Sequence, residues 1–299
     1  MRSRLLALPV LLSAAALALS ACGGSSAAGE TSGKTSVVAA FYPLQYAAQA
    51  VGGDSVNVTT LTEPGVEPHD LELTAAQVAQ IAEADVVLYI KGFQPAVDEA
   101  VAQQAGDRAI DVAAGLSRLN GDESEGAALD PHVWLNPLNM ASIGQAIATR
   151  LAEVDPDSAA TITANAAGLS DSMATLDGEY KAGLATCART DMVVSHEAFA
   201  YLAAAYGLTQ VGISGLSPEA EPSPARMRDV ADLVTREGIT TIYYETLVDP
   251  KVAQTIADET GASAAVLDPL EGLAADSTSD YVSVMQQNLA TLETGQGCT

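Results

Sequence analysis

Residues 35–61 read TSVVAAFYPLQYAAQAVGGDSVNVTTL, and three local patterns follow one another in this segment. Residues 37–40 are a short apolar run that is typical of a buried strand. Residues 44–51 have helical periodicity and end at two glycines, which favour the end of a helix. Residues 56–61 are rich in β-branched side chains and predict a second strand. The segment therefore predicts a strand–helix–strand unit, the connection that joins parallel strands.

The same alternation continues along the chain. Residues 73–84 fit a helix, 86–90 a strand and 96–104 another helix. Strands that alternate with helices indicate an α/β fold, in which a mostly parallel sheet is flanked by helices.

The pattern then recurs about 155 residues further along the chain. Val193-Val194-Ser195-His196 repeats residues 37–40, and Glu221-Pro222 repeats Glu67-Pro68. A third match pairs residues 268–273 with 111–116, which share Asp, Gly and Leu at the same spacing. Because the matches keep their order at a nearly constant offset, we predict two similar α/β lobes.

A helical stretch lies between the two halves. Asn136-Pro137 starts one helix, and Asp155-Pro156 starts the next with a cap and a first-turn proline. Apolar residues recur at helical spacing from 162 to 180, over about five turns. We predict a first lobe at residues 35–154, a rigid connecting helix at 155–185 and a second lobe at 186–299.

The composition excludes one broad class of function. The chain has 299 residues, with 38 acidic and 13 basic side chains, and its formal net charge is −25. A protein with this charge cannot neutralise a phosphate backbone, so a general nucleic-acid binder is excluded. Hydrophobic residues make up 48% of the chain, enough for sizeable cores.

The N-terminus has the pattern of an export signal. Arg2 and Arg4 precede an apolar run at residues 5–19 that is too short for an ordinary membrane span. The sequence Leu-Ser-Ala-Cys ends this run and matches a bacterial lipobox, in which Cys22 becomes the lipidated first residue. We predict a signal peptide at 1–21 and a flexible tether at 22–34. The protein would then be exported and held on the cell membrane by lipid, facing the periplasm or the cell exterior.

Two further cysteines occupy the second half of the chain. Cys187 lies at the start of the second lobe and Cys298 at the chain end. In an exported protein, a pair of cysteines forms a disulfide more often than it binds a metal, so we predict a Cys187–Cys298 bond.

The three histidines carry the chemical argument. His69 lies in a turn after the second strand, and His132 precedes the helical stretch. His196 ends the first strand of the second lobe, where the first lobe has Ala40. Ligands of doubly wound sheets bind beyond the carboxyl ends of the strands, so we expect these imidazoles to converge on a cleft between the lobes.

Three neutral imidazoles can fill three tetrahedral positions on zinc. Asp268 is the first candidate for the fourth ligand, because it follows an apolar strand-like run at 264–267. A helix cap ahead of Pro269 is an equally good interpretation of Asp268. Asp111, its counterpart in the first lobe, and Glu245, at another strand end, are the alternatives.

The sequence does not contain other common catalytic or nucleotide-binding motifs. Position 200 is Ala rather than the second His of HExxH, and neither GxGxxG nor a phosphate-binding loop occurs. Gly-Leu-Ser-Pro at 215–218 is not a nucleophile elbow, which needs a glycine on both sides of the serine.

In segments spread over residues 35–290, the sequence resembles the zinc- and manganese-binding lipoproteins of bacterial ABC importers, the cluster A-I solute-binding proteins. The resemblance rests on the following segments: AFYPLQYAAQAVGGD, EPHD, AEADVVLYIKG, DPHVWLNP, SHEAFAYL, EPSPARMRDV and VLDPL. It implies two α/β lobes, a rigid connecting helix and one metal in the interlobe cleft. Its ligand positions carry over to His69, His132, His196 and Asp268.

The resemblance also implies delivery of the metal to a membrane permease that a cytoplasmic ATPase drives. Manganese-type members resemble this pattern but have a carboxylate where His196 stands. Many zinc members have a His-rich loop before the second His, and residues 117–130 contain none.

We therefore expect a monomeric binding protein for Zn²⁺, and not an enzyme. Three His and one carboxylate favour zinc over manganese, which prefers shells richer in oxygen. Two alternatives remain open: a manganese-binding member of the same family, and a zinc-dependent hydrolase, since three His and a water form a catalytic zinc shell. An additional adhesin role is also compatible with the sequence.

Overall fold

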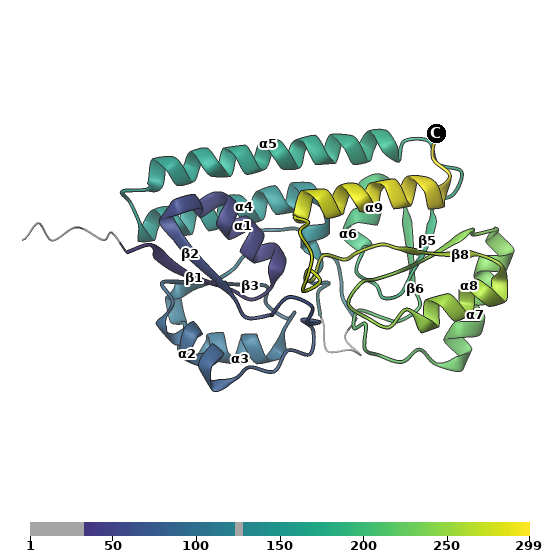
Figure 1. Cartoon of the computed structure of the whole chain (residues 1–299), viewed down its shortest axis with the longest axis horizontal. Coiled ribbons are helices and arrows are strands. Elements are labelled where there is room, and N and C mark those ends of the chain that lie inside the picture. Colours follow the sequence, from purple (N-terminus) through teal and green to yellow (C-terminus); the bar gives the residue numbers. More distant parts are fainter. Residues whose placement is uncertain (1–32, 123–127) are drawn as a thin grey trace, which may run out of the picture. The chain divides into compact units, whose positions relative to one another are not determined.

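The computed structural model describes residues 33–122 and 128–299 (Figure 1). The predicted signal peptide, Cys22 and nearly all of the predicted tether lie outside the described residues, as does most of the acidic segment at 122–125. Residues Lys34–Thr299 form one compact unit. Within the part that the structure describes, no helix has the length and apolar character needed to cross a bilayer.

The first lobe is built on a four-stranded parallel sheet with the order β2-β1-β3-β4. Its strands are β1 (Thr35–Ala39), β2 (Val56–Thr60), β3 (Val86–Tyr89) and β4 (Ala109–Asp111). Its helices are α1 (Tyr42–Gly52), α2 (Ala75–Glu83) and α3 (Pro95–Gln104), with short 3₁₀ turns at Gly53–Ser55 and Gly106–Arg108. Thr74 caps α2 through a reciprocal pair of bonds with Gln77, as a capping box does. The predicted strand–helix alternation is confirmed.

The second lobe repeats this topology. Its parallel sheet has the order β6-β5-β7-β8, with the first strand again in the middle. Its strands are β5 (Asp191–Val194), β6 (Thr209–Gly212), β7 (Thr241–Tyr244) and β8 (Ser263–Val266). Its helices are α6 (Ala200–Tyr206), α7 (Pro224–Glu237), α8 (Lys251–Thr260) and α9 (Tyr281–Gln296). The matching strand orders confirm the two similar lobes that the repeat predicted.

Two helices link the lobes. The chain leaves the first lobe through α4 (Pro137–Val154), turns back and runs along α5 (Ala159–Gly183). In Figure 1, α5 extends over both sheets; it packs on α1 and α4 at one end and on α9 at the other. Asp177 is buried on this helix together with the predicted apolar stripe. The stripe consists of Ile162, Ala166, Leu169, Met173, Leu176 and Tyr180. The hydroxyl of Tyr180 donates to the carbonyl of Met285 in α9, which ties the connecting helix to the second lobe.

The chain end is fixed to the start of the second lobe. Cys187 and Cys298 form a disulfide, as predicted, with an S–S distance of 2.00 Å. Backbone bonds continue the contact on both sides of it, since Ala188 N donates to Gly297 O and Thr299 N to Thr186 O. The last turn of α9 is thereby held beside the segment that enters β5.

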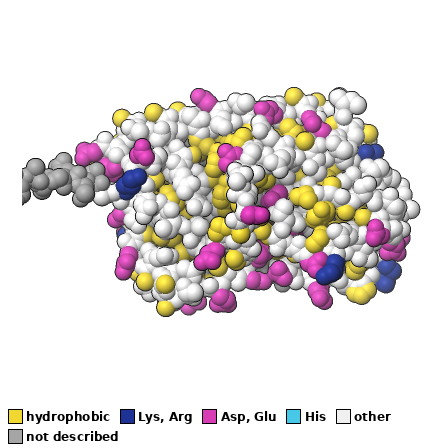
Figure 2. Space-filling model, viewed as in Figure 1, with side chains coloured by type: hydrophobic (Ala, Val, Ile, Leu, Met, Phe, Trp, Pro, Cys, Tyr) yellow, Lys and Arg dark blue, Asp and Glu magenta, His cyan; other side chains and the backbone are white. Residues whose placement is uncertain are grey.

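The main apolar core runs through both lobes and includes Trp134, the single tryptophan of the chain. A smaller apolar cluster lies in the second lobe under α7 and α8, around Val193, Val230 and Ile242. On the face drawn in Figure 2, acidic side chains are spread widely, whereas Lys and Arg occur at few places. No histidine is visible on this face, and all three histidines belong to the described part of the chain.

Candidate metal centre

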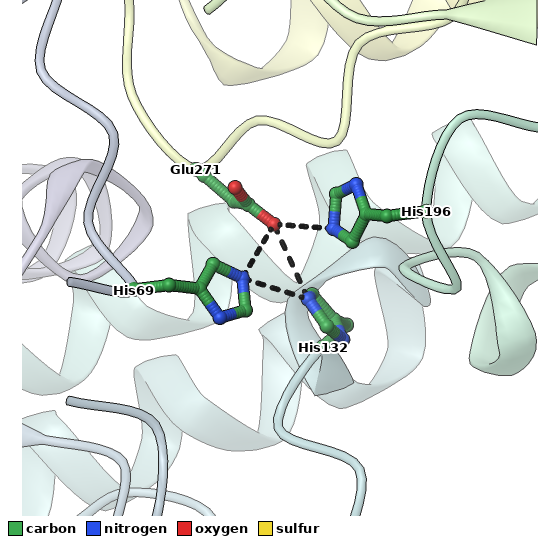
Figure 3. Close-up of side chains that lie close together, drawn as sticks. All are labelled: His69, His132, His196 and Glu271. Carbon is green, nitrogen blue, oxygen red and sulfur yellow. Dashed lines mark hydrogen bonds and ion pairs between the residues drawn. The ribbon is translucent and has the colours of Figure 1, made fainter. Parts of the chain in front are cut away.

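The three histidines come from different parts of the chain and meet at one point (Figure 3). His69 lies in the loop between β2 and α2, and His196 lies two residues beyond the end of β5. His132 immediately precedes a 3₁₀ turn, Val133–Leu135, that leads into α4. The carboxyl ends of strands in both lobes therefore deliver imidazoles to one site, as the topology predicted.

Glu271 is the fourth member of the group. Its Oε1 atom lies 3.3 Å from His69 Nε2, 3.2 Å from His132 Nε2 and 3.1 Å from His196 Nε2. The Nε2 atoms of His69 and His132 are 3.4 Å apart. All four potential ligand atoms lie within 4.8 Å of one another, which is the spacing expected of donors around one small cation.

The site is secluded from solvent. The side chains of His132 and His196 are 0% and 1% exposed, and that of Glu271 is 2% exposed. His69 is the most accessible of the four, with 10% of its side chain exposed. Phe93 packs edge-on against the His69 ring, and Trp134 packs against the His132 ring. Aromatic walls of this kind restrict how each imidazole can rotate.

Buried carboxylates orient two of the imidazoles. His132 Nδ1 lies 2.8 Å from Asp130 Oδ1, and His196 Nδ1 lies 2.9 Å from Glu245 Oε1. The Ser195 hydroxyl also donates to Glu245 Oε1, at 2.6 Å. Because each Nδ1–H donates to a carboxylate, the neutral imidazole directs the lone pair of Nε2 toward the centre of the group. Metal-binding histidines commonly have this arrangement.

The buried carboxylates and imidazoles of the group shift one another's pKa values. Burial opposes ionisation of Glu271, but the surrounding imidazoles outweigh it and hold the pKa of this carboxyl well below its usual range. Burial lowers the pKa of His196, and the charges of Glu245 and Glu271 more than reverse this, so the pKa of His196 lies well above its ordinary value. These opposite shifts favour an ion pair between the Glu271 carboxylate and the His196 imidazole.

The pKa values of the other two imidazoles shift in opposite directions. Burial dominates at His69 and lowers its pKa, although the charge of Glu271 acts in the opposite direction. At His132, the hydrogen bonds to Asp130 and Glu271 outweigh burial, and the pKa is raised. Close by, burial and the charge of Glu271 raise the pKa of Glu67 to about 7, while Glu67 Oε1 accepts the backbone N–H of His69.

The structure brings His69, His132 and His196 together, and it places Asp268 outside the group. Asp268 Oδ1 accepts the backbone N–H of Leu270 at 2.7 Å, and its Oδ2 accepts the Thr246 hydroxyl at 2.8 Å. The side chain thus caps the turn that leads to Glu271.

The two alternative carboxylates also lie outside the group. Asp111 Oδ1 accepts backbone N–H groups of Lys91 and Ala113 at the end of β4. Glu245 is adjacent to the group but faces Nδ1 of His196, where it orients the ring. Glu271 is the carboxylate in contact with the Nε2 atoms of all three histidines.

One signal in the sequence could have identified Glu271. The repeat that aligns residues 268–273 with 111–116 places Glu271 opposite Ala114. The same comparison places His196 opposite Ala40. At both positions, the second lobe has a metal-binding type of side chain where the first has alanine, and this difference marks residues that the fold itself does not require.

The chain is similar in sequence to zinc-binding proteins of other bacteria. The chain is 35% identical over 301 residues to the zinc-binding lipoprotein AdcA of Streptococcus pneumoniae, a match that covers 95% of this chain and 60% of that protein. It is 32% identical to the high-affinity zinc uptake system protein ZnuA of Bacillus subtilis, with 95% of each chain covered. This chain thus spans about 60% of the length of AdcA and nearly all of ZnuA.

A solved structure has the same fold as this chain. The Zn(II)-bound ZnuA-like domain of Streptococcus pneumoniae AdcA superposes with a TM-score of 0.77 at 35% identity, covering 88% of this chain and 99% of that domain. The family described as zinc-uptake complex component A, periplasmic, matches residues 37–295. The chain therefore belongs to the zinc-uptake complex component A family of periplasmic proteins.

Proposed function

We propose that this protein captures Zn²⁺ outside the cytoplasmic membrane and delivers it to the permease of an ABC-type importer. The zinc ligands are Nε2 of His69, His132 and His196 together with the carboxylate of Glu271. The observation that carries this proposal is the group of four donor atoms within 4.8 Å, contributed by both lobes. A cargo ion held between two lobes can be released when they move apart, which suits a carrier.

The donor set favours zinc. Three imidazole nitrogens and one carboxylate oxygen are typical zinc ligands, whereas Mn²⁺ prefers more oxygen donors and a higher coordination number. The buried carboxylates behind His132 and His196 strengthen the nitrogen donors further. We therefore expect zinc to displace manganese from this site.

The position of Glu271 also favours a carrier over a hydrolase. A catalytic zinc keeps one coordination position open for water. Here the fourth position faces Glu271 Oε1, which lies within 3.3 Å of each of the three Nε2 atoms. A carboxylate at that point closes the shell, so the bound metal serves as cargo and the protein is not an enzyme.

The export and anchoring steps rest on the sequence. We propose that the chain is cleaved before Cys22, lipidated there and tethered to the membrane by residues 22–34, with a first lobe at 35–154, a connecting helix at 155–185 and a second lobe at 186–299. The protein acts as a monomer on its permease. If Cys22→Ala leaves the protein on the membrane to the same extent as the wild type, the anchor proposal is wrong; the expected outcome is release of soluble protein that still binds zinc.

A competition titration tests the metal assignment. The purified protein is titrated with Zn²⁺ against a chromophoric chelator, with and without excess Mn²⁺. We expect one zinc per chain, retained in the presence of manganese, and a larger loss of affinity for each His→Ala variant than for Glu271→Ala. Substoichiometric zinc, or displacement of zinc by manganese, would contradict the proposal.

A further inference from the structure

The residue that precedes Glu271 has an unusual backbone conformation. Leu270 has a φ of 54°, and it is the only non-glycine residue with positive φ in the described ranges 33–122 and 128–299. Its side chain is completely buried. A left-handed conformation is unfavourable for an ordinary L residue, and it persists only where the surroundings impose it.

Asp268 holds this conformation from the second lobe. Its Oδ1 atom accepts the Leu270 N–H at 2.7 Å, and its Oδ2 accepts the Thr246 hydroxyl. The backbone of Asp268 is itself fixed by the buried side chain of Asn288 in α9, which accepts from Asp268 N at 2.9 Å and donates to Asp268 O at 2.7 Å. The start of the turn is therefore rigid.

Trp134 holds the same turn from the segment that carries His132. Its indole Nε1–H donates to the carbonyl of Pro269 at 2.8 Å, and the whole side chain is buried. The carbonyl of Trp134 in turn accepts the hydroxyl of Tyr281 at 2.6 Å. The Trp134 ring also lies 5.3 Å from the His132 ring, so one side chain contacts both a histidine of the site and the turn that carries Glu271.

We propose that Asp268 and Trp134 are positioning residues that hold the turn 268–271 in its strained conformation, and thereby keep the Glu271 carboxylate on the metal. The inference rests on the proposed function, since it concerns how the same site retains its zinc. Loss of either hydrogen bond lets Leu270 relax to negative φ, which turns the Glu271 side chain away from the histidines. The site then opens to three imidazoles and a water, and zinc leaves faster.

If Asp268 affects zinc release only by positioning Glu271, its effect must disappear when Glu271 is absent. A double-mutant cycle tests this. Zinc dissociation is measured by stopped-flow with an excess of chelator for the wild type, Asp268→Ala, Glu271→Ala and the double variant. We expect Asp268→Ala to release zinc about 10- to 100-fold faster, the range typical for residues that support a ligand. The double variant should release zinc at the rate of Glu271→Ala alone, because there is no carboxylate left to position.

Two matched variants separate positioning from loss of charge or of folding. Asp268→Asn keeps an oxygen that can accept the Leu270 N–H, so we expect it to restore most of the slow release. Asp276→Ala removes an exposed carboxylate further along the same connection to α9, and we expect the wild-type rate. Thermal unfolding of every variant confirms that the fold is intact.

Trp134→Phe tests the second hydrogen bond in the same way. Phenylalanine keeps an aromatic ring next to His132 but cannot donate to Pro269 O. Zinc release should again become faster, and this effect should disappear in the Glu271→Ala background.

Three results would overturn the inference: a wild-type rate for Asp268→Ala, rate effects that multiply in the double variant, or an Asp268→Asn variant as fast as Asp268→Ala. The second result would make Asp268 act independently of Glu271, and the third would assign its effect to its charge and not to the hydrogen bond with Leu270. Failure of the wild type to bind zinc would instead reject the proposed function itself.

Discussion

Glu271 Oε1 lies 3.3 Å from His69 Nε2, although 202 residues separate them in the chain. His69 belongs to a loop of the first lobe, and Glu271 follows the last strand of the second lobe. A metal ion bound between them therefore connects the two lobes directly. We propose that capture and release of the ion depend on how this pair is held.

Zinc binding should release protons at neutral pH. Burial lowers the pKa of His196, but the charges of Glu245 and Glu271 outweigh it and raise this pKa well above its ordinary value, which favours the protonated imidazole. Zinc requires the neutral form, and binding must displace the proton. Glu271, whose pKa is lowered, is already ionised and contributes none.

Calorimetry in two buffers with different ionisation enthalpies measures this effect, and we expect about one proton or more per zinc at pH 7. Affinity should fall as the pH is lowered, because protons compete with zinc for the imidazoles. The raised pKa values of His132 and His196 start this competition at higher pH, whereas burial lowers the pKa of His69 and keeps it neutral to lower pH. Proton-free binding at pH 7, with affinity unchanged down to pH 5, would be incompatible with this site.

Glu245→Gln should weaken zinc binding without removing a ligand. The Glu245 carboxylate orients His196 by accepting a hydrogen bond from its Nδ1–H. It accepts a second hydrogen bond from the Ser195 hydroxyl. An amide is a weaker acceptor and leaves His196 less basic, so we expect a loss of about 10- to 100-fold in affinity. Asp249→Asn, which changes an exposed carboxylate paired with Lys251, is the control and should bind like the wild type. If both variants bind zinc with equal affinity, Glu245 does not support zinc binding through His196.

The disulfide should stabilise the folded protein without affecting the metal. It links residues that are 111 positions apart, and closing a loop of this length is worth about 4–5 kcal/mol in the chain-entropy model. Denaturant unfolding of a Cys187→Ser/Cys298→Ser variant measures this loss, while zinc affinity should change little. Thiol titration of denatured, unreduced protein should find neither cysteine free; two titratable thiols would refute the bond.

Two glycines in the connecting helix should be replaceable with a gain in stability. Gly168 and Gly178 are exposed in the interior of α5, and an added Cβ would meet nothing within 4 Å at either position. Alanine should therefore raise the free energy of unfolding by about 0.5–1 kcal/mol per site.

Gly295→Ala in α9 is the contrasting variant. Its Cβ would lie 2.9 Å from Cζ of the buried Tyr243 and 3.1 Å from Cβ of Thr241. Overpacking of this kind costs roughly 1–3 kcal/mol. Chemical denaturation of all three variants tests the prediction, and a stable Gly295→Ala protein or destabilised α5 variants would count against the packing described here.

Most of the fold could be predicted because it repeats. The apolar run at 37–40 and its copy at 193–196 both mark a central strand, and in each lobe this strand pairs with its neighbours in the same order. The apolar stripe on α5 could also be predicted, because helical spacing determines which side chains share a face. Helical periodicity and internal repetition are both visible in the amino-acid sequence itself.

The fourth member of the site does not follow from periodicity, and the repeat marks it only through the difference between Glu271 and Ala114. Choosing Asp268 assumed that the residue after an apolar run points into the cleft. The chain instead uses this carboxylate to cap Leu270, whose positive φ reverses the backbone and brings Glu271 to the histidines. Leucine rarely adopts that conformation, so no propensity rule reveals it. It depends on Trp134 and Asn288, which are distant in sequence.

X-ray absorption spectroscopy at the zinc edge identifies the ligands of the bound metal. We predict three imidazoles and one carboxylate oxygen at about 2.0–2.1 Å around zinc in the wild-type protein. Glu271→Ala should keep all three imidazoles and replace the carboxylate by a water, and Asp111→Ala should leave the spectrum unchanged. A wild-type spectrum with fewer than three imidazoles, or one that Glu271→Ala does not alter, would contradict the three-histidine, one-glutamate site.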